Sequence, residues 1–259
     1  MGLRRVDEAV ITRAIVRRAL EDIISCAEVD AIVVGAGPSG LTAARYLARG
    51  NARTIVLERR LSFGGGIGGG GMLFPKVVVE RPADEALREV GVRLEEYEEG
   101  VYVADPAEMM AKMAVGAIDA GAKIILGVTV EDVAFKGGEI TGVVVQWTAV
   151  RESGLHVDPL AFRSKAVIDC TGHAAEVLSV AARKIPDLRL KVLGEASMHA
   201  PAAERLIVEH AGQVRPGLFA AGMAVAALYG LPRMGPIFGG MLLSGRKVAG
   251  LVLRRVKGQ

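Results

Sequence analysis

Buried strands and amphipathic helices alternate in the hydropathy pattern of this chain. Short apolar segments rich in Val and Ile, at residues 29–34, 52–58 and 164–169, predict strands that are covered on both faces. Residues 41–47 and 106–121 instead repeat their apolar side chains at helical intervals. Strands that alternate with helices in this way form a parallel sheet with helices packed on it. The pattern therefore predicts an α/β fold.

An antiparallel excursion interrupts this alternation. Residues 123–147 have the pattern strand, strand, Gly-Gly turn and strand, which predicts a β-meander at about residues 128–148. The last strand is expected at residues 216–223 and the last helix at residues 234–255. Because no long Pro- or Ser-rich linker and no internal repeat is present, residues 1–259 are expected to form a single domain.

An amphipathic helix is expected at the N-terminus, at about residues 4–25. Its apolar side chains fall near one face of the helix, at Val6, Val10, Ile15, Ala19 and Ile23. Acidic and basic residues run through the whole segment, which is not the charge pattern of a signal peptide. The acidic residues favour a helix docked on the protein over a helix that lies on a membrane surface.

The turn after the first strand carries a glycine pattern typical of dinucleotide binding. The pattern is Gly35-x-Gly37-x-x-Gly40 between a strand and a helix, and Glu58 ends the next strand. Gly35 permits the tight turn, Gly37 lets backbone N–H groups approach a pyrophosphate, and Gly40 lets the helix pack closely on the strand. Glu58 would accept hydrogen bonds from ribose hydroxyls and repel a 2′-phosphate. This unit predicts a Rossmann-like domain of the flavoprotein type (GR2-like) that binds an unphosphorylated dinucleotide.

Seven glycines lie between Gly64 and Gly71, shortly after the second strand. Such a run adds nothing to a hydrophobic core and has high entropy in the unfolded chain. A flexible linker would join segments of different character, but the sequence on the two sides is similar. We therefore expect this loop to pack its backbone against a bound ligand. Ligands bind beyond the carboxyl ends of parallel strands, where residues 171–173 and the loop after Met223 also fall.

Composition narrows the choice of partners and compartment. The net charge is +3 and the arginines are scattered, so the chain lacks the basic patch that nucleic acid binding needs. No apolar run is long enough to cross a membrane, so no membrane association is expected. The two cysteines, Cys26 and Cys170, cannot form a disulfide framework, which suits the reducing cytoplasm.

Histidine and aspartate cluster within residues 152–173. The side chains of His156 and Asp158 would share one face of an extended segment, and the proline after Asp158 favours that conformation. Together with His173 they form the ligand inventory of a non-haem Fe(II) site with open positions. Histidine and aspartate also occupy loops because they are well solvated, so the spacing alone leaves both interpretations open.

The motifs of the chain, in their order, resemble those of the thiamine thiazole synthase family. They are GAGPSG, ERRLSFGGG, LHVDP, CTGH and GLPRMGPIFGGMLLSG, and they extend over nearly the whole chain. The resemblance implies an enzyme for which NAD is a substrate rather than a cofactor like a permanently bound flavin. Family members release nicotinamide, condense the opened ADP-ribose with glycine, add sulfur and close an adenylated carboxythiazole, the thiazole precursor of thiamine. The resemblance also implies a homo-oligomer, namely a ring-like octamer, with the N-terminal helix as a candidate interface element.

The same resemblance assigns the site residues. Asp158 and His173 match the family's ligands for Fe(II), and His156 either lines the site or ligates weakly. Arg233 matches the arginine that holds the glycine carboxylate, a task that suits its fork-shaped guanidinium. Contacts with the nucleotide and the intermediate are expected from Gly35, Gly37, Ser39, Gly40, Glu58, Arg59, Gly65, Gly66, Val130, Met223, Arg233, Met234 and Gly235.

One position departs from the pattern of the fungal and plant members. There a cysteine two residues before the Asp-Pro pair donates its own sulfur, whereas this chain has His156 at that position. An imidazole has no sulfur to give, so the chain is similar to the archaeal branch that uses sulfide. We expect repeated turnover, with Fe(II) bringing sulfide and the glycine imine together. Cys170 is the alternative sulfur donor, but its place on a predicted strand favours burial.

Other functions stay open on the sequence. An FAD-dependent oxidoreductase would use the same fingerprint, although the glycine-rich loop and RMGPIFGG are not typical flavin motifs. Relatives of this family have also been labelled ribose 1,5-bisphosphate isomerases, and a non-catalytic NAD-binding module would bind NAD without releasing nicotinamide. His210 is expected to be structural, and His199 has no assigned role.

Overall fold

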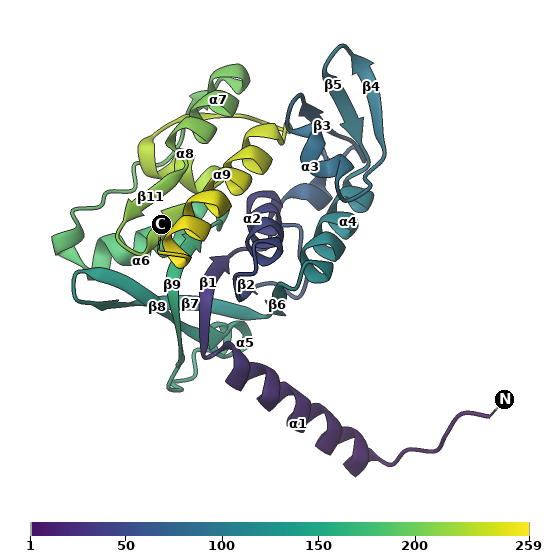
Figure 1. The fold of residues 1–259 in the computed structure, drawn as a ribbon, viewed down its shortest axis with the longest axis vertical. Helices are drawn as coiled ribbons and strands as arrows, with labels where there is room; N and C mark the ends of the chain where they lie inside the picture. Colours follow the sequence, from purple (N-terminus) through teal and green to yellow (C-terminus); the bar gives the residue numbers. More distant parts are fainter. Residues whose placement is uncertain (1, 259) are drawn as a thin grey trace.

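The computed structural model describes residues 2–258 and has a parallel sheet at its centre (Figure 1). Five strands of an eight-stranded sheet pair in parallel in the order β12, β9, β1, β2, β6. They are β1 (Glu28–Val34), β2 (Thr54–Glu58), β6 (Lys123–Leu126), β9 (Leu160–Asp169) and β12 (Leu218–Ala220). The strand β11 (Gly212–Arg215) adds to β12 in antiparallel orientation. The expected α/β class and parallel sheet are confirmed.

The predicted β-meander is also present. β7 (Val128–Lys136) and β8 (Glu139–Trp147) form a hairpin, and β8 continues antiparallel against the first half of β9. The hairpin turns at Gly137 and Gly138, where φ is +59° and +85°. A two-residue hairpin turn requires positive φ at both positions, which explains the Gly-Gly pair.

Helices cover the parallel sheet. α2 (Pro38–Arg49) packs between α9 (Gly239–Val256) and α4 (Pro106–Asp119), while α6 (Glu176–Lys184) packs on β7. Met109 and Met113 of α4 are buried in the core, as expected from the sequence. The remaining helices are α3 (Asp84–Arg88), α5 (Thr148–Ser153), α7 (Ala200–His210) and α8 (Met223–Tyr229), with single turns η1 (Ile67–Gly69), η2 (Gly172–Ala174) and η3 (Pro186–Leu188).

Two small sheets have no counterpart in the sequence-based expectations. β3 (Val77–Glu80), β5 (Val101–Ala104) and β4 (Leu94–Glu98) form an antiparallel sheet of three short strands. β10 (Ala196–Met198) pairs in parallel with β13 (Pro232–Arg233). Strands this short, with β4 largely exposed, have too few apolar residues for a clear alternation.

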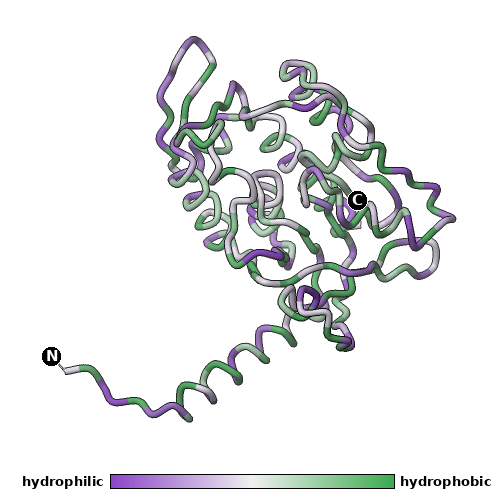
Figure 2. Tube along the Cα trace, turned by 180° about the vertical axis from the view of Figure 1, so that it is seen from behind, coloured by the Kyte–Doolittle hydropathy of each residue, from purple (hydrophilic) through white to green (hydrophobic). Residues whose placement is uncertain are grey.

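The N-terminal helix α1 (Glu8–Cys26) projects away from the rest of the protein (Figure 1). Asp7 caps it by accepting a hydrogen bond from the backbone N–H of Val10 at 3.0 Å. Figure 2 shows apolar positions recurring along this projecting helix. On the expected apolar face, Val6, Val10 and Ile15 are exposed and only Ile23 is half-buried. The expectation that this helix docks on its own chain is therefore wrong.

None of the helices within residues 2–258 combines the length and the apolar character that a membrane crossing requires.

Two carboxyl groups meet at the N-terminus of α9. Glu204 of α7 accepts a hydrogen bond from the backbone N–H of Gly240, and a Cβ at Gly239 would overlap the carboxyl group of Glu80. Glu80 Oε2 and Glu204 Oε1 are buried, and neither has a donor among the described residues. A proton shared between the two carboxyls supplies that donor. Burial, together with the neighbouring Glu80, raises the pKa of Glu204 to about 9.

Glu204→Gln is expected to flatten the dependence of stability on pH. A carboxyl group with a raised pKa in the folded state contributes stability below its unfolded pKa, near 4.5, and that stability is lost as pH rises toward about 9. The Gln amide would donate to Glu80 at every pH and still accept from Gly240. Thermal unfolding from about pH 5 to about pH 9 checks this. The variant should lose less Tm over that range than the native protein or the exposed control Glu209→Gln, and equal losses would refute the shared proton.

Candidate functional site

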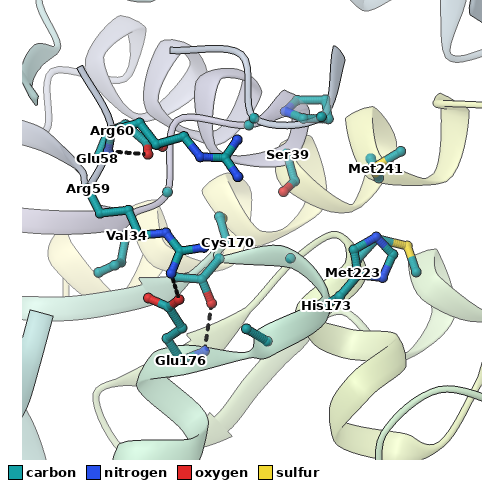
Figure 3. A pocket seen from close by; sticks show the side chains of 18 of the residues that line it. Val34, Ser39, Glu58, Arg59, Arg60, Cys170, His173, Glu176, Met223 and Met241 are labelled. Carbon is teal, nitrogen blue, oxygen red and sulfur yellow. Dashed lines mark hydrogen bonds and ion pairs between the residues drawn. The ribbon is translucent and has the colours of Figure 1, made fainter. Parts of the chain in front are cut away.

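A cavity of about 420 Å³ opens at the carboxyl ends of β1, β2 and β9 (Figure 3). Its wall brings together the glycine turn after β1, the end of β2, the glycine-rich loop, the start of β7, the segment after β9 and the residues around β13. Of the residues expected at the site, those that line it are Gly35, Gly37, Ser39, Glu58, Arg59, Gly65, Gly66, Val130, His173, Met223, Arg233, Met234 and Gly235.

The glycine turn fits tightly against the end of β9. Gly35 has φ +101°, and a Cβ at this position would lie 2.5 Å from the carbonyl oxygen of Cys170. A Cβ at Gly40 would overlap the carbonyl oxygen of Gly35, so Gly40 serves helix packing and does not line the cavity. A Cβ at Gly37 would meet only the Cα of Gly65, at 4.0 Å. The N-terminus of α2 therefore faces open space that can take an anion.

Glu58 is held rigidly at the cavity. The residue is 7% exposed, and its Oε2 and Oε1 accept hydrogen bonds from the backbone N–H groups of Ala36 and Arg60, each at 2.9 Å. Each carboxylate oxygen can accept a second hydrogen bond. The carboxylate is thus oriented to bind hydroxyl groups and to repel a phosphate.

The glycine-rich loop serves two purposes. Gly65 and Gly66 line the cavity, as expected for a loop that meets a ligand. Gly64 and Gly70 are needed by the protein itself, because a Cβ at either position would overlap Met110 or the carbonyl oxygen of Phe74. Contact with a ligand therefore accounts for only part of the glycine run.

Cys170 lies in the wall of the cavity and is buried, as expected. Burial is the main cause that raises the pKa of its thiol, and the neighbouring Asp169 raises it further. Burial also raises the pKa of Cys26, at the end of α1. Both thiols thus stay protonated at neutral pH, so neither is a ready nucleophile or sulfur donor.

A buried carboxylate shapes the turn that carries His173. Asp169 is fully buried, and its Oδ1 accepts hydrogen bonds from the Thr171 backbone N–H at 2.9 Å and the Thr171 hydroxyl at 2.7 Å. Its Oδ2 accepts from the backbone N–H of Leu178 at 2.9 Å. The Thr171 hydroxyl in turn accepts from the backbone N–H of Glu176 at 2.7 Å. This network ties the end of β9 to the start of α6 and fixes the single turn between them.

The His173 ring stands next to Met223 on one side of the cavity, across from the ion pair between Arg59 and Glu176 (Figure 3). The His173 side chain is 59% exposed, and its Nδ1 pairs with the carboxylate of Glu195. Its Nε2 is therefore free for a metal or a proton. Nothing in the sequence pattern pointed to Glu195, because it lies in an irregular segment without periodicity.

Asp158 and His156 lie far from this cavity. Both are exposed in the segment just before β9, whereas His173 follows the end of that strand. Ten residues of β9 intervene, which corresponds to roughly 30 Å at the usual rise of a strand. Within residues 2–258 no group of three or more His, Cys, Asp or Glu side chains is placed to hold a metal ion. The expected closeness of Asp158 and His173 is therefore wrong for a single chain.

The other two histidines have local contacts. His199 Nδ1 accepts a hydrogen bond from the backbone N–H of Ala202 at 3.3 Å and caps α7. His210 packs its ring against Tyr229, with 5.3 Å between the ring centroids. These contacts agree with a structural role for His210 and indicate one for His199.

Comparisons with known proteins agree on one family. The model of the Thi4 family matches residues 12–238. A thiamine thiazole synthase of Archaeoglobus fulgidus is 63% identical over 254 residues, which cover 97% of each chain. A thiamine thiazole synthase of Metallosphaera sedula is 57% identical over 259 residues, covering 99% of this chain and 96% of the relative. The crystal structure of Thermovibrio ammonificans THI4 matches with a TM-score of 0.95 and 41% identity, over 98% of this chain and 100% of that one.

Proposed function

The chain belongs to the Thi4 family, and from this premise we propose that it makes ADP-5-ethyl-4-methylthiazole-2-carboxylate from NAD, glycine and sulfide with Fe(II) as cofactor. Relatives that are 57% and 63% identical over nearly the full chain are thiamine thiazole synthases. The protein is therefore an enzyme of thiamine biosynthesis that forms the thiazole. Its substrates, its metal and its sulfur source are the proposal.

NAD is proposed to enter along the glycine turn. The open space above Gly37 and the N-terminus of α2 suit the pyrophosphate, and the rigid carboxylate of Glu58 suits the ribose hydroxyls. From there the cavity continues to His173 and Arg233, so one bound dinucleotide could extend toward both side chains. This continuous cavity is the observation that carries the proposal.

Arg233 is proposed to hold the carboxylate of glycine. It is an exposed residue on β13 that lines the cavity, and the described hydrogen bonds and ion pairs give its guanidinium no partner within residues 2–258. A free guanidinium can bind a carboxylate through two parallel hydrogen bonds.

Arg233→Lys is expected to raise KM for glycine by about 10- to 100-fold, because one charged hydrogen bond of about 1.5–3 kcal/mol is lost. The affinity for NAD should stay within about twofold, since the charge is kept. Steady-state kinetics with each substrate varied in turn measures both, with the exposed Arg183→Lys on α6 as control. Equal losses for glycine and NAD would remove Arg233 from this role.

The Fe(II) site fits the structure only if two copies contribute to it. His173 has the arrangement of a ligating histidine, with one ring nitrogen held by a carboxylate and the other free. Asp158 could join it from a second copy, because it lies on an exposed segment flanked by the exposed apolar residues Leu155, Val157 and Leu160. Fe(II) bound there would supply a Lewis acid with open positions for sulfide.

A homo-oligomer, an octamer by family resemblance, is part of the same proposal. The projecting helix α1 exposes Val10, Ile11, Ile15 and Leu20, an apolar surface that a second copy could cover. An interface of this kind would bring the segment before β9 of one chain near the cavity of another. His156, which stands beside Asp158, would then line the shared site.

The sulfur is proposed to come from sulfide. His156 carries none, and Cys26 and Cys170 are buried with raised thiol pKa values. A protein that keeps its own sulfur atoms can turn over repeatedly. Two free, buried cysteines also fit a reducing cytoplasm, which we propose as the compartment.

Anaerobic incubation with NAD, glycine, sulfide and Fe(II), followed by mass analysis for the ADP-thiazole, tests the proposed function. Omission of any one component should abolish the product. An FAD-dependent oxidoreductase would contain flavin after purification, and a ribose 1,5-bisphosphate isomerase would need none of the four components. Product that forms without sulfide or without iron would refute that part of the proposal.

A further inference from the structure

We propose that Glu195 is a positioning residue that fixes the tautomer and the orientation of His173. The inference rests on the proposed function only in so far as it makes the free nitrogen of His173 a metal ligand. Glu195 itself lines no part of the cavity and acts through the imidazole.

The contact differs from an ordinary surface ion pair. The Glu195 side chain is 14% exposed, whereas the His173 side chain is 59% exposed. Among the described residues the Glu195 carboxylate has no hydrogen-bond partner other than His173. A carboxylate withdrawn from water needs a partner, so burial of Glu195 depends on a donor at Nδ1 of His173.

Both sides of the contact are anchored. The backbone N–H groups of Leu193 and Gly194 donate to the carbonyl oxygen of Ala227 at 3.0 and 2.9 Å, and the N–H of Ala196 donates to Leu231 at 2.9 Å. Glu195 is thus pinned between α8 and the segment that leads into β13. On the other side, the Asp169 network fixes the turn that carries His173. Two anchored backbones place the carboxylate and the ring against each other.

The anchoring also links His173 to Arg233. Glu195 directly precedes β10, which pairs with β13, and the backbone N–H of His199 donates to the carbonyl oxygen of Arg233 at 3.0 Å. The same two-stranded element therefore sets the position of the guanidinium and, through Glu195, of the imidazole. Both groups face the one cavity.

The chemical consequence lies in the tautomer. A neutral imidazole has one N–H, and a carboxylate that accepts from Nδ1–H leaves Nε2 with its lone pair. Nε2 can then bind a metal or accept a proton from a ligand in the cavity. Without Glu195 the ring could carry its proton on Nε2 and present a donor instead, or rotate away from the cavity. Glu195 thus makes His173 a lone-pair donor toward the cavity.

The first test reads the tautomer directly. Magic-angle-spinning NMR of the metal-free protein with ¹⁵N-labelled histidine, at about pH 8 where histidine is neutral, distinguishes Nδ1–H from Nε2–H. The signal of His173 is assigned by its loss in His173→Asn. We expect Nδ1–H in the native protein and in Glu195→Gln, whose amide oxygen still accepts. We expect loss of this preference in Glu195→Ala, and an unchanged His173 signal in that variant would overturn the proposal.

The second test measures binding of Co(II), an air-stable probe. Glu195→Ala should weaken Co(II) binding by about 10- to 100-fold, as loss of a carboxylate behind a ligating histidine does, and Glu195→Gln should weaken it less. Glu209→Ala, which removes an exposed glutamate of α7, should bind as the native protein does. Equal affinity of Glu195→Ala and the native protein would count against the positioning role.

The two measurements separate the two proposals. If the native protein binds no Co(II) but the tautomer depends on Glu195, the metal site of the proposed function fails and the positioning role stands. If the native protein binds Co(II) and both the tautomer and the affinity ignore Glu195, the positioning role fails and the metal site stands. Thermal unfolding of each variant shows that a loss does not come from misfolding.

Discussion

Asp158→Ala and His173→Ala are each expected to lower thiazole formation by more than about 100-fold, and joining the two inactive chains in one oligomer should restore part of it. Loss of an outer partner of a metal ligand already costs about 10- to 100-fold, so loss of a ligand should cost more. Restoration is expected because Asp158 and His173 lie at opposite ends of β9, too far apart to act within one chain.

The restored activity has a defined size. In a mixed oligomer with equal numbers of the two variants, each shared site needs an intact Asp158 from one chain and an intact His173 from another. Random assembly supplies both in about a quarter of the sites. Co-expression with two different tags, two-step purification and activity measurement per site test this. The exposed Asp187→Ala, paired with His173→Ala in the same way, should behave as a chain with intact Asp158.

Two results would contradict the shared site. A mixed oligomer as inactive as its parents would show that the two residues do not complement each other between chains. Full activity of Asp158→Ala alone would show that this carboxylate takes no part in the reaction.

Asp169→Asn is expected to lower the free energy of unfolding by about 2–4 kcal/mol, since it leaves buried donors of Thr171 or Leu178 without an acceptor. The amide group would face one of these N–H groups with a donor of its own. Because the same network shapes the turn of His173, the variant that remains folded should also bind Co(II) more weakly. Chemical denaturation measures the first effect.

A matched substitution separates this network from a general loss of charge. Asp187→Asn changes an exposed aspartate in η3 and should alter the free energy of unfolding by less than about 0.5 kcal/mol. If Asp169→Asn were as stable as Asp187→Asn, the hydrogen bonds of Asp169 would not hold the turn as described.

Much of the fold and of the cavity could be predicted from local pattern. A parallel sheet has continuous apolar strands, and their carboxyl ends meet at one edge, so Gly37, Glu58 and His173 could be brought together without knowledge of the structure. The same logic does not distinguish a glycine that meets a ligand from one that meets protein. Gly40 and Gly64 are required by contacts with Gly35 and Met110, which only the packed structure reveals.

The failures have a common physical cause. Asp158 and His173 are close in sequence, but the extended strand between them carries them apart, so nearness in sequence misled. The apolar face of α1 indicated burial, yet a chain taken alone cannot show whether its own residues or a second copy cover that face. Glu195 lies in irregular backbone held by long-range hydrogen bonds, for which no periodicity exists.

The account depends on sulfur that enters from outside the protein, and sulfide enriched in a heavy sulfur isotope tests this most directly. The native protein, incubated anaerobically with labelled sulfide, NAD, glycine and Fe(II), should form more product molecules than there are protein chains. All of that product should carry the heavy isotope, and the mass of the protein should be unchanged. Unlabelled product limited to one molecule per chain, with a protein lighter by one sulfur, would contradict the account.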